Sequence, residues 1–191
     1  MYKDRVFFIV DFETTGLDVR GHYPIEVGGL FTDSDFTVLD IYKSFIKWPD
    51  LEKEIIEYGN IWPPKYAEGY EFHKISASGY IRWEKKDNIK VRSPEEVAND
   101  LQYFCKEFKR DKRNPTMVSD NSVFEHSFME KIFESSKIVF PFHYSTWDSS
   151  MFLELSGVRR PMLPHRAFSD ASSLHNALVR ARGKLDLFEK R

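Results

Sequence analysis

The sequence predicts a single α/β domain in which helices cover a mixed β-sheet. Two features of the chain support this fold class. The first 46 residues contain three strand-like segments joined by short connections, so these strands are expected to form an antiparallel meander. After residue 92, strand-like and helical patterns alternate, which is typical of an α/β arrangement.

The composition fits one folded domain. The chain has 191 residues, of which 41% are hydrophobic and 16% aromatic, enough for a substantial core. The net charge is -2, so the protein lacks the overall positive charge that would indicate a nucleic-acid partner. The single cysteine, Cys105, excludes an internal disulfide and fits a reducing compartment. Because no apolar run reaches membrane-spanning length and the N-terminus has no signal-like segment, we expect a cytoplasmic protein without membrane contacts.

Strand patterns dominate the first part of the chain. Val6–Val10 is an unbroken apolar run, typical of a strand buried on both faces, and the first strand is expected over Tyr2–Val10. A second strand is expected over Pro24–Phe31 and a third over Phe36–Ile46, with a turn at Asp33–Asp35 between them. These segments predict the antiparallel part of the sheet.

Residues 48–92 are the least regular part of the chain, and we expect them to be an insertion in the domain. The stretch is rich in aromatic, proline and basic residues, and Leu51–Tyr58 has the pattern of a short helix. Aromatic rings interleaved with basic side chains can stack bases and bind phosphates. Such rings more often pack a loop onto its domain. A loop of this length in a compact domain is often functional, so both roles stay open.

Helical patterns dominate the second half of the chain. Ser93 is followed by Pro94 and, two residues later, by Glu96, which is the sequence of a capped helix start. The later elements are expected in this order: a strand at Thr116–Ser119, a helix capped by Asp120 and Asn121 with Phe124, Phe128 and Ile132 on its apolar face, a strand at His143–Trp147, a helix at Ser149–Leu155, and a final helix from about Ser169 with Ala171, Leu174, Leu178 and Ala181 on its apolar face.

Two carboxylates directly follow the first strand. Asp11 and Glu13 are separated by Phe12, so on an extended backbone their side chains point to the same side. Two acids at the end of a hydrophobic strand repel each other and lose solvation, and a bound cation stabilises such an arrangement. Oxygen ligands suit a hard divalent ion such as Mg²⁺ or Mn²⁺. Taken alone, the pair is also compatible with a polar strand end that leads into a solvated turn.

Three further residues have side chains suited to the same chemistry. His165 is expected in a loop, and a histidine that is neutral near pH 7 can take a proton from water. Asp170 is expected in the first turn of the final helix, where the dipole favours its charge and where it can complete an acidic cluster. Glu125 lies beside the apolar stripe at the start of its helix. Each of these residues alone is a common surface feature.

Together, three motifs resemble those of the DEDD 3′→5′ exonucleases of the DnaQ-like group, in the branch with a catalytic histidine (DEDDh). Asp11–Leu17, with the sequence Asp-Phe-Glu-Thr-Thr-Gly-Leu, matches the first motif residue for residue. Asn121–Glu125 is similar to the second, in which Asn-x-x-Phe precedes a catalytic Asp, and His165–Ala171 matches the third, His-x-Ala-x-x-Asp-Ala. Weaker similarities occur at Ile25–Gly28, Phe72–Ser76 and Trp147–Ser149.

The resemblance implies an RNase H-like fold with a five-stranded mixed sheet, in which strands 1–3 are antiparallel and the later strands are parallel. It also implies release of nucleoside 5′-monophosphates from the 3′ end of single-stranded DNA or RNA. His165 would act as the general base on the attacking water. Two divalent metal ions, Mg²⁺ or Mn²⁺, would be bound by the acidic residues Asp11, Glu13, Glu125 and Asp170.

The same resemblance implies which residues bind the substrate. The main chain of Thr14 and Thr15 and the side chain of Leu17 would hold the terminal nucleotide. Phe124, next to Asn121 of the second motif, would support its base or sugar, and core packing explains Phe124 equally well. The other candidates are Phe72 or His73 beside the next nucleotide, and Arg159, Arg160 and Arg166 near the upstream phosphates. The arginines are equally compatible with a solvated position.

One departure from the family pattern leaves alternatives open. Glu125 stands where the family has Asp, and Asp120 is near enough to be a substitute. The longer side chain of Glu125 can alter how the second metal is held. A catalytically weakened or inactive nucleic-acid-binding module is therefore the alternative to an active exonuclease. The sequence does not distinguish DNA from RNA, and a homodimer is an expectation drawn from relatives that dimerise.

Overall fold

The computed structural model of the chain describes residues 4–49, 90–159 and 166–189, with side chains in the last range described up to residue 184. Most of the insertion expected at residues 48–92 lies outside these ranges, including the expected helix Leu51–Tyr58 and the candidates Phe72 and His73. Arg160 and His165 also lie outside the described residues.

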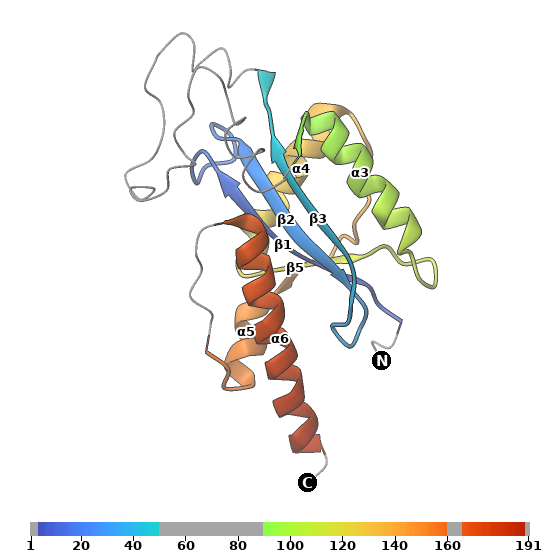
Figure 1. Cartoon of the computed structure of the whole chain (residues 1–191), viewed down its shortest axis with the longest axis vertical. Helices are drawn as coiled ribbons and strands as arrows, with labels where there is room; N and C mark the ends of the chain where they lie inside the picture. Colours follow the sequence, from blue (N-terminus) through green and yellow to red (C-terminus); the bar gives the residue numbers. More distant parts are fainter. Residues whose placement is uncertain (1–3, 50–89, 160–165, 190–191) are drawn as a thin grey trace.

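The described residues form one mixed sheet with helices on both faces, which is the predicted α/β architecture (Figure 1). Among them, six strands lie in the order β4-β3-β2-β1-β5-β6. The strands are β1 Phe7–Thr14, β2 Pro24–Thr32, β3 Val38–Ile46, β4 Val91–Arg92, β5 Thr116–Ser119 and β6 Trp147–Asp148. The first three strands are antiparallel. β4 is parallel to β3, β5 to β1 and β6 to β5, as the resemblance implied.

This sheet has one strand more than the five that the resemblance implies. The additional strand is β4, at the edge, which pairs with Phe45 and Ile46 at the end of β3. Two residues are too few to produce a strand pattern, so only the tertiary pairing defines β4. β6 is equally short. The strand expected at His143–Trp147 is wrong in extent, because only Trp147 and Asp148 pair with β5.

Four helices of the described residues cover the two faces of the sheet (Figure 1). They are α3 Pro94–Glu107 and α4 Ser122–Ser136 on one face, and α5 Ser149–Leu155 and α6 Ala167–Glu189 on the other. α6 begins two residues before the predicted Ser169, because the Asp170 N–H already donates to the Arg166 carbonyl at 2.8 Å. None of the helices in the described ranges combines the length and the apolarity needed to cross a membrane.

The central strand β1 contributes to two separate cores. The even-numbered residues from Val6 to Phe12 lie in the core beneath α3 and α4, whereas Phe7 and Ile9 lie in the core beneath α5 and α6. The predicted burial of this strand on both faces is therefore confirmed. Its predicted end at Val10 is wrong: β1 continues through the acidic residues because β2 runs alongside it.

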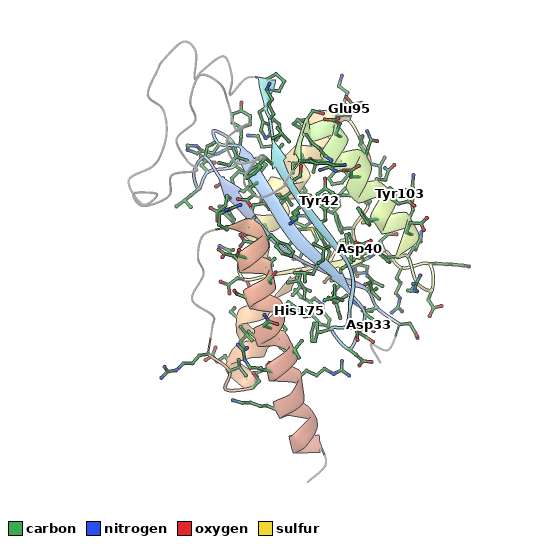
Figure 2. All side chains as sticks on the ribbon, in the orientation of Figure 1. Asp33, Asp40, Tyr42, Glu95, Tyr103 and His175 are labelled. Atoms are coloured by element: carbon green, nitrogen blue, oxygen red, sulfur yellow. The ribbon has the colours of Figure 1, made fainter. Side chains whose placement is uncertain are left out.

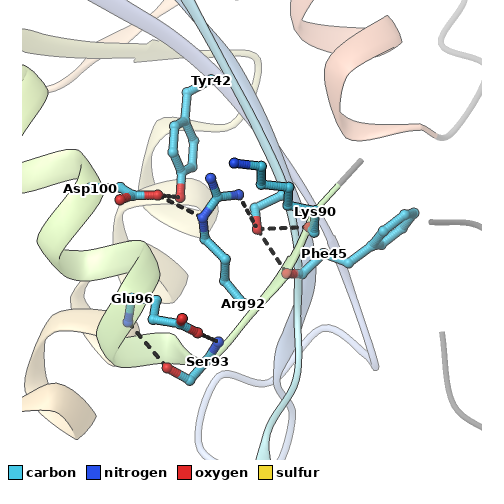
Figure 3. Close-up of polar contacts among 8 residues, drawn as sticks. Tyr42, Phe45, Lys90, Arg92, Ser93, Glu96 and Asp100 are labelled. Carbon is cyan, nitrogen blue, oxygen red and sulfur yellow. Dashed lines mark hydrogen bonds and ion pairs between the residues drawn. The ribbon is translucent and has the colours of Figure 1, made fainter. Parts of the chain in front are cut away.

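The predicted capping box at the start of α3 is present (Figure 3). Ser93 Oγ accepts a hydrogen bond from the Glu96 N–H at 3.2 Å, and the Ser93 N–H donates to Glu96 Oε2 at 2.7 Å. Next to it, Arg92 of β4 pairs with Asp100 of α3, with Nε 2.7 Å from Oδ2. Tyr42 of β3 donates to the same oxygen at 3.3 Å. One carboxylate thus joins β3, β4 and α3.

The turn between β2 and β3 contacts α6. Phe36 has a left-handed backbone, with φ of 61°, which explains why β3 begins at Val38 and not at the predicted Phe36. His175 of α6 points to this turn, and its Nε2–H donates to the Phe36 carbonyl at 2.8 Å (Figure 2). Further along α6, Arg182 pairs with the Asp35 carboxylate. These contacts fix the direction of α6 across the sheet.

The first turn of α6 lies unusually close to the sheet. A Cβ atom on Gly28 of β2 would stand 2.1 Å from the backbone nitrogen of Phe168 and 2.6 Å from the carbonyl carbon of Ala167. A larger residue would push the start of α6 away from β2. Because Gly28 is the ladder partner of Asp11, the close contact brings α6 next to the acidic end of β1.

Replacing Gly28 by alanine is expected to lower the free energy of unfolding by about 1–3 kcal/mol, the cost of overpacking a tight contact. Gly183, also in α6, is the control, because a Cβ there would meet no described neighbour within 4 Å. Gly183→Ala should raise the free energy of unfolding by about 0.5–1 kcal/mol through helix propensity. Urea unfolding measures both changes. A neutral effect of Gly28→Ala would contradict the close packing.

Candidate active site

Three carboxylates converge where β1 ends and α6 begins. Asp11 and Glu13 of β1 and Asp170 of α6 each offer one oxygen atom, and these three atoms all lie within 4.8 Å of one another. Asp11 and Glu13 are partly buried, and Asp170 is only 3% exposed. The three oxygens are close enough to share one cation.

The alternation of side chains along β1 explains why its two acids meet α6. Phe7 and Ile9 pack beneath α5 and α6, and Asp11 and Glu13 continue the same face of the strand. Phe12, between the two acids, lies in the opposite core. The shared side predicted for Asp11 and Glu13 is therefore the side that α6 covers.

Glu125 reaches this place from the other face of the sheet. It lies in the first turn of α4, is 5% exposed, and accepts a hydrogen bond from the backbone N–H of Phe12. Its Oε2 atom is buried and has no hydrogen-bond partner among the residues that the structure describes. A buried carboxylate oxygen without a partner is costly, and a bound cation would satisfy it.

Asp120, the alternative to Glu125, lies one residue before Asn121, the N-cap of α4. Burial raises the pKa of Glu125 most, followed by the charge of Glu13, and Asp120 contributes less. Glu125 in turn raises the pKa of Asp11 more than any other charge does. Glu125 is thus the direct electrostatic neighbour of the converging carboxylates.

Burial and mutual repulsion oppose full ionisation of this cluster in the absence of a cation. Burial raises the pKa of Glu13 to about 8, with further contributions from the charges of Glu26 and Asp170. The pKa of Asp11 is raised well above its usual range, first by burial and then by the charge of Glu125. A divalent cation between the carboxylates would favour their charged forms.

The donor set fits a hard divalent ion. Asp11, Glu13, Glu125 and Asp170 offer only carboxylate oxygens, which are the ligands that Mg²⁺ and Mn²⁺ prefer. The Oε2 atom of Glu125, unpartnered within the described ranges, is available as an additional ligand atom. The residues that the structure describes at this end of β1 are therefore chemically suited to the metals that the sequence predicts.

A buried ion pair, not foreseen from the sequence, holds the start of α6. Glu26 of β2 is the ladder partner of Glu13 and is 2% exposed. The Nε and Nη2 atoms of Arg166 donate to its two carboxylate oxygens at 3.3 and 3.4 Å, and the Ala167 N–H also donates to this carboxylate. The positive charge of Arg166 lowers the pKa of both Glu13 and Glu26, against the larger effect of burial.

Arg166 was expected near the upstream phosphates of the substrate, and the structure places its guanidinium against Glu26. The guanidinium lies 6.0 Å from the centre of the Phe45 ring, and the side chain is 18% exposed. Arg159, by contrast, is exposed.

The sequence contains a signal for the role of Glu26. It is an acidic residue within the apolar stretch Ile25–Gly28, and because this stretch is buried on both faces, the acid needs a partner.

Thr14, Thr15 and Leu17 lie where the chain leaves β1. Thr14 Oγ1 donates to the Gly16 carbonyl at 2.7 Å, and Thr15 Oγ1 accepts from the Tyr23 N–H at 2.9 Å. The side chain of Leu17 is 77% exposed. This loop is therefore ordered by its own polar contacts while presenting an apolar side chain to solvent.

Asn121 and Phe124 lie next to Glu125 at the start of α4. Asn121 Oδ1 accepts from the Phe124 N–H at 3.4 Å, the contact of an N-cap. The Phe124 ring packs edge-on against Phe128, with centroids 4.8 Å apart, and stays partly exposed. Packing thus occupies one side of the Phe124 ring and leaves part of it accessible.

Comparison with known protein families gives one match over most of the chain. A family model described as exonuclease (RNase T) matches residues 8–178. Among the curated proteins, no sequence matches the chain.

Solved exonuclease structures share this fold. The nuclease domain of 3′hExo, a DEDDh family member bound to rAMP, has a TM-score of 0.59 and 14% identity, with 97% of this chain and 94% of that chain covered. The zinc-bound E. coli exonuclease I complex with single-stranded DNA has a TM-score of 0.61 and 15% identity, with 98% and 42% covered. A 3′-exonuclease that recognises the 3′ end of a histone mRNA stem-loop has a TM-score of 0.57 and 16% identity, with 97% and 65% covered. The chain spans less than half the length of exonuclease I.

The raised pKa values predict that the metal-free protein loses stability as the pH rises from about 5 to about 8. Unfolded carboxylates titrate near pH 4, whereas folded Glu13 titrates at about 8, so between these values the folded state binds more protons. Thermal unfolding in a chelator measures the loss. Saturating Mg²⁺ should raise the melting temperature more at the higher pH, because the metal favours the ionised carboxylates.

Glu13→Gln is the control for this pH dependence, because the amide does not titrate and should flatten the pH profile. A metal-free wild-type protein that is equally stable across this range, or a Glu13→Gln profile as steep as that of the wild type, would contradict the electrostatic account of the cluster.

Proposed function

This chain belongs to the RNase T exonuclease family, of the DEDDh type, and on that premise we propose that it is a metal-dependent 3′→5′ exonuclease. It removes nucleoside 5′-monophosphates from the 3′ end of single-stranded DNA or RNA. The convergence of Asp11, Glu13 and Asp170 within 4.8 Å is the observation that supports the proposal most. Carboxylates buried this close together are unfavourable unless a cation binds them.

Asp11, Glu13, Glu125 and Asp170 would hold two divalent ions, Mg²⁺ or Mn²⁺. When bound, such ions would supply a lowered pKa for a water molecule and stabilisation of the charge that develops on the scissile phosphate. The four carboxylates come from three elements, β1, α4 and α6. The close packing of α6 on Gly28 and the ion pair between Arg166 and Glu26 keep Asp170 in place.

His165 accepts the proton of the attacking water. The water oxygen bonds to phosphorus while the bond from phosphorus to the 3′ oxygen of the preceding nucleotide breaks, and that oxygen then takes up a proton. The products are one nucleoside 5′-monophosphate and a nucleic-acid strand shortened by one nucleotide. Support for this role is the position of His165 in the third motif, directly before the anchored Arg166.

The loop after β1 and the start of α4 bind the terminal nucleotide. Thr14 and Thr15 contact it through their main chain, and Leu17 contacts it through its exposed side chain. Phe124, partly exposed beside the Asn121 cap, supports the base or sugar. Similar structures include a complex with single-stranded DNA and a 3′-exonuclease that recognises a histone mRNA stem-loop, so we propose both DNA and RNA as substrates to be compared.

The alternative is an exonuclease fold that binds nucleic acid with weak or no hydrolysis. The observation that favours it is Glu125, one methylene longer than the aspartate of the family motif. Against it, Glu125 is buried, accepts a hydrogen bond from the Phe12 N–H, and has one oxygen without a partner in the described part of the chain. That arrangement fits a metal ligand better than a lost site.

Digestion of 5′-labelled single-stranded DNA and RNA of one sequence tests the proposal directly. In Mg²⁺ or Mn²⁺, the protein should shorten the strands one nucleotide at a time from the 3′ end. Asp11→Ala should abolish the ladder without unfolding the protein, because it removes a central metal ligand. Circular dichroism checks the fold. Cleavage of strands with a blocked 3′ end would indicate an endonuclease, and persistent activity of Asp11→Ala would exclude the two-metal assignment.

A paired comparison identifies the acid contributed by the second motif. Glu125→Gln should lower the hydrolysis rate by at least about a hundredfold, the scale of a lost electrostatic contact to the transition state. Asp120→Asn should change it little, because Asp120 acts on the cluster mainly through Glu125. Rates are measured at saturating metal with the same labelled strand. The reverse pattern would assign the role to Asp120, and no effect of either variant would favour the binding module.

A further inference from the structure

Lys131 of α4 reaches the loop that follows β1. Its Nζ atom donates to the carbonyl oxygen of Val19 at 2.6 Å and to that of His22 at 2.7 Å. The ammonium also lies 4.3 Å from the centre of the Tyr23 ring. Two carbonyl groups and one aromatic ring of the segment Val19–Tyr23 therefore contact the single ammonium group of Lys131 in α4.

The loop itself is closed at its base. The Thr15 N–H donates to the Tyr23 carbonyl at 2.9 Å, and the Tyr23 N–H donates to Thr15 Oγ1 at 2.9 Å. Thr15 Oγ1 also lies 3.1 Å from Nδ1 of His22. The His22 ring in turn covers Gly16, where a Cβ atom would stand 2.6 Å from the ring. Because these contacts join both ends of the loop, a displacement moves the segment as a whole.

The position of Leu17 depends on this backbone. The side chain is 77% exposed, so packing does not hold it. The Asp18–Arg20 ion pair in the same loop has side chains that are 53% and 88% exposed, and exposed pairs contribute little to order. The described contacts from this loop to the rest of the protein include the Lys131 bonds and the Tyr23 ring, which lies 5.0 Å from the Trp48 ring.

The hydrogen bonds of Lys131 form a tether between α4 and the backbone of the loop. Burial lowers the pKa of Lys131, and the charge of Asp18 opposes this shift. The partners are main-chain carbonyls, so the contact depends on where the backbone lies and not on which side chains the loop has. Hydrogen bonds from a charged donor are roughly twice as strong as neutral ones.

We propose that Lys131 is a positioning residue for the substrate, which fixes the Thr15–Tyr23 loop to the helix that contains Glu125. The inference rests on the proposed function, in which Thr15 and Leu17 hold the terminal nucleotide. One helix then sets the position of two parts of the site, the carboxylate next to the metal ions and the loop next to the nucleotide. Loss of the tether weakens nucleotide binding and leaves the acidic cluster unchanged.

Three variants test this inference. Lys131→Met keeps the length of the side chain and removes its donors. Lys131→Arg restores charged donors and should recover most of the loss. Lys106→Met is the control, because Lys106 is an exposed lysine of α3 that donates to Gln102, away from the loop.

Amide hydrogen exchange reports on the loop without any need for activity. The N–H groups of Thr15, His22 and Tyr23 are hydrogen-bonded within the loop. In Lys131→Met they should exchange at least about tenfold faster, while the amides of the sheet keep their protection. Unchanged exchange in the loop would overturn the proposal whether or not the protein is an active nuclease.

Binding and kinetics separate positioning from a general loss of structure. For Lys131→Met we expect KM to rise by about ten- to a hundredfold, the effect of a displaced binding group, with kcat nearly unchanged. Affinity for a nucleoside 5′-monophosphate should fall in parallel, whereas Mn²⁺ binding followed by electron paramagnetic resonance should not change. Lys106→Met should match the wild type in every measurement.

Two further outcomes are decisive. If the loop exchanges faster but KM and nucleotide affinity stay at wild-type values, the loop does not position the substrate and the proposal fails. If the wild type neither binds nucleotides nor degrades strands, the proposed function fails, while hydrogen exchange still decides whether Lys131 holds the loop.

Discussion

Electrostatic repulsion among buried carboxylates is the constraint on which the rest of this structure depends. Asp11, Glu13 and Asp170 present oxygens within 4.8 Å of one another, and Glu125 is buried beside them. Such a cluster is unfavourable in a protein interior unless protons or cations neutralise it. Its presence at the end of the central strand therefore fits the proposed site for divalent ions, and it predicts a less stable protein in their absence.

The fold brings these acids together through close packing of helices on both faces of one strand. The alternating side chains of β1 pack under α3 and α4 on one side and under α5 and α6 on the other. At the end of the strand this alternation presents acidic residues to α6, and Gly28 allows the first turn of α6 to approach the sheet. The Glu26–Arg166 pair then fixes that turn, so the position of Asp170 follows from the sheet itself.

The acidic cluster and the loop after β1 serve different purposes in the proposed exonuclease. The cluster provides charge for metal ions, and the loop provides backbone and an apolar side chain for the nucleotide. α4 connects them, because Glu125 lies in its first turn and Lys131 lies six residues further along. Membership in the exonuclease family fits this division, since the matched region, residues 8–178, includes both parts.

The sequence alone determined the features that arise from local patterns. The period of two residues in a strand places Asp11 and Glu13 on one side, and the capping box defines the start of α3. Only the tertiary structure decided the rest. β4 is too short to have a pattern, and Glu26 and Arg166 are 140 residues apart in the chain. The carbonyl oxygens that Lys131 binds belong to the main chain, which every residue has, so no residue type reveals them. Local sequence encodes periodicity and caps, whereas the choice of which surfaces meet depends on the packing of the whole chain.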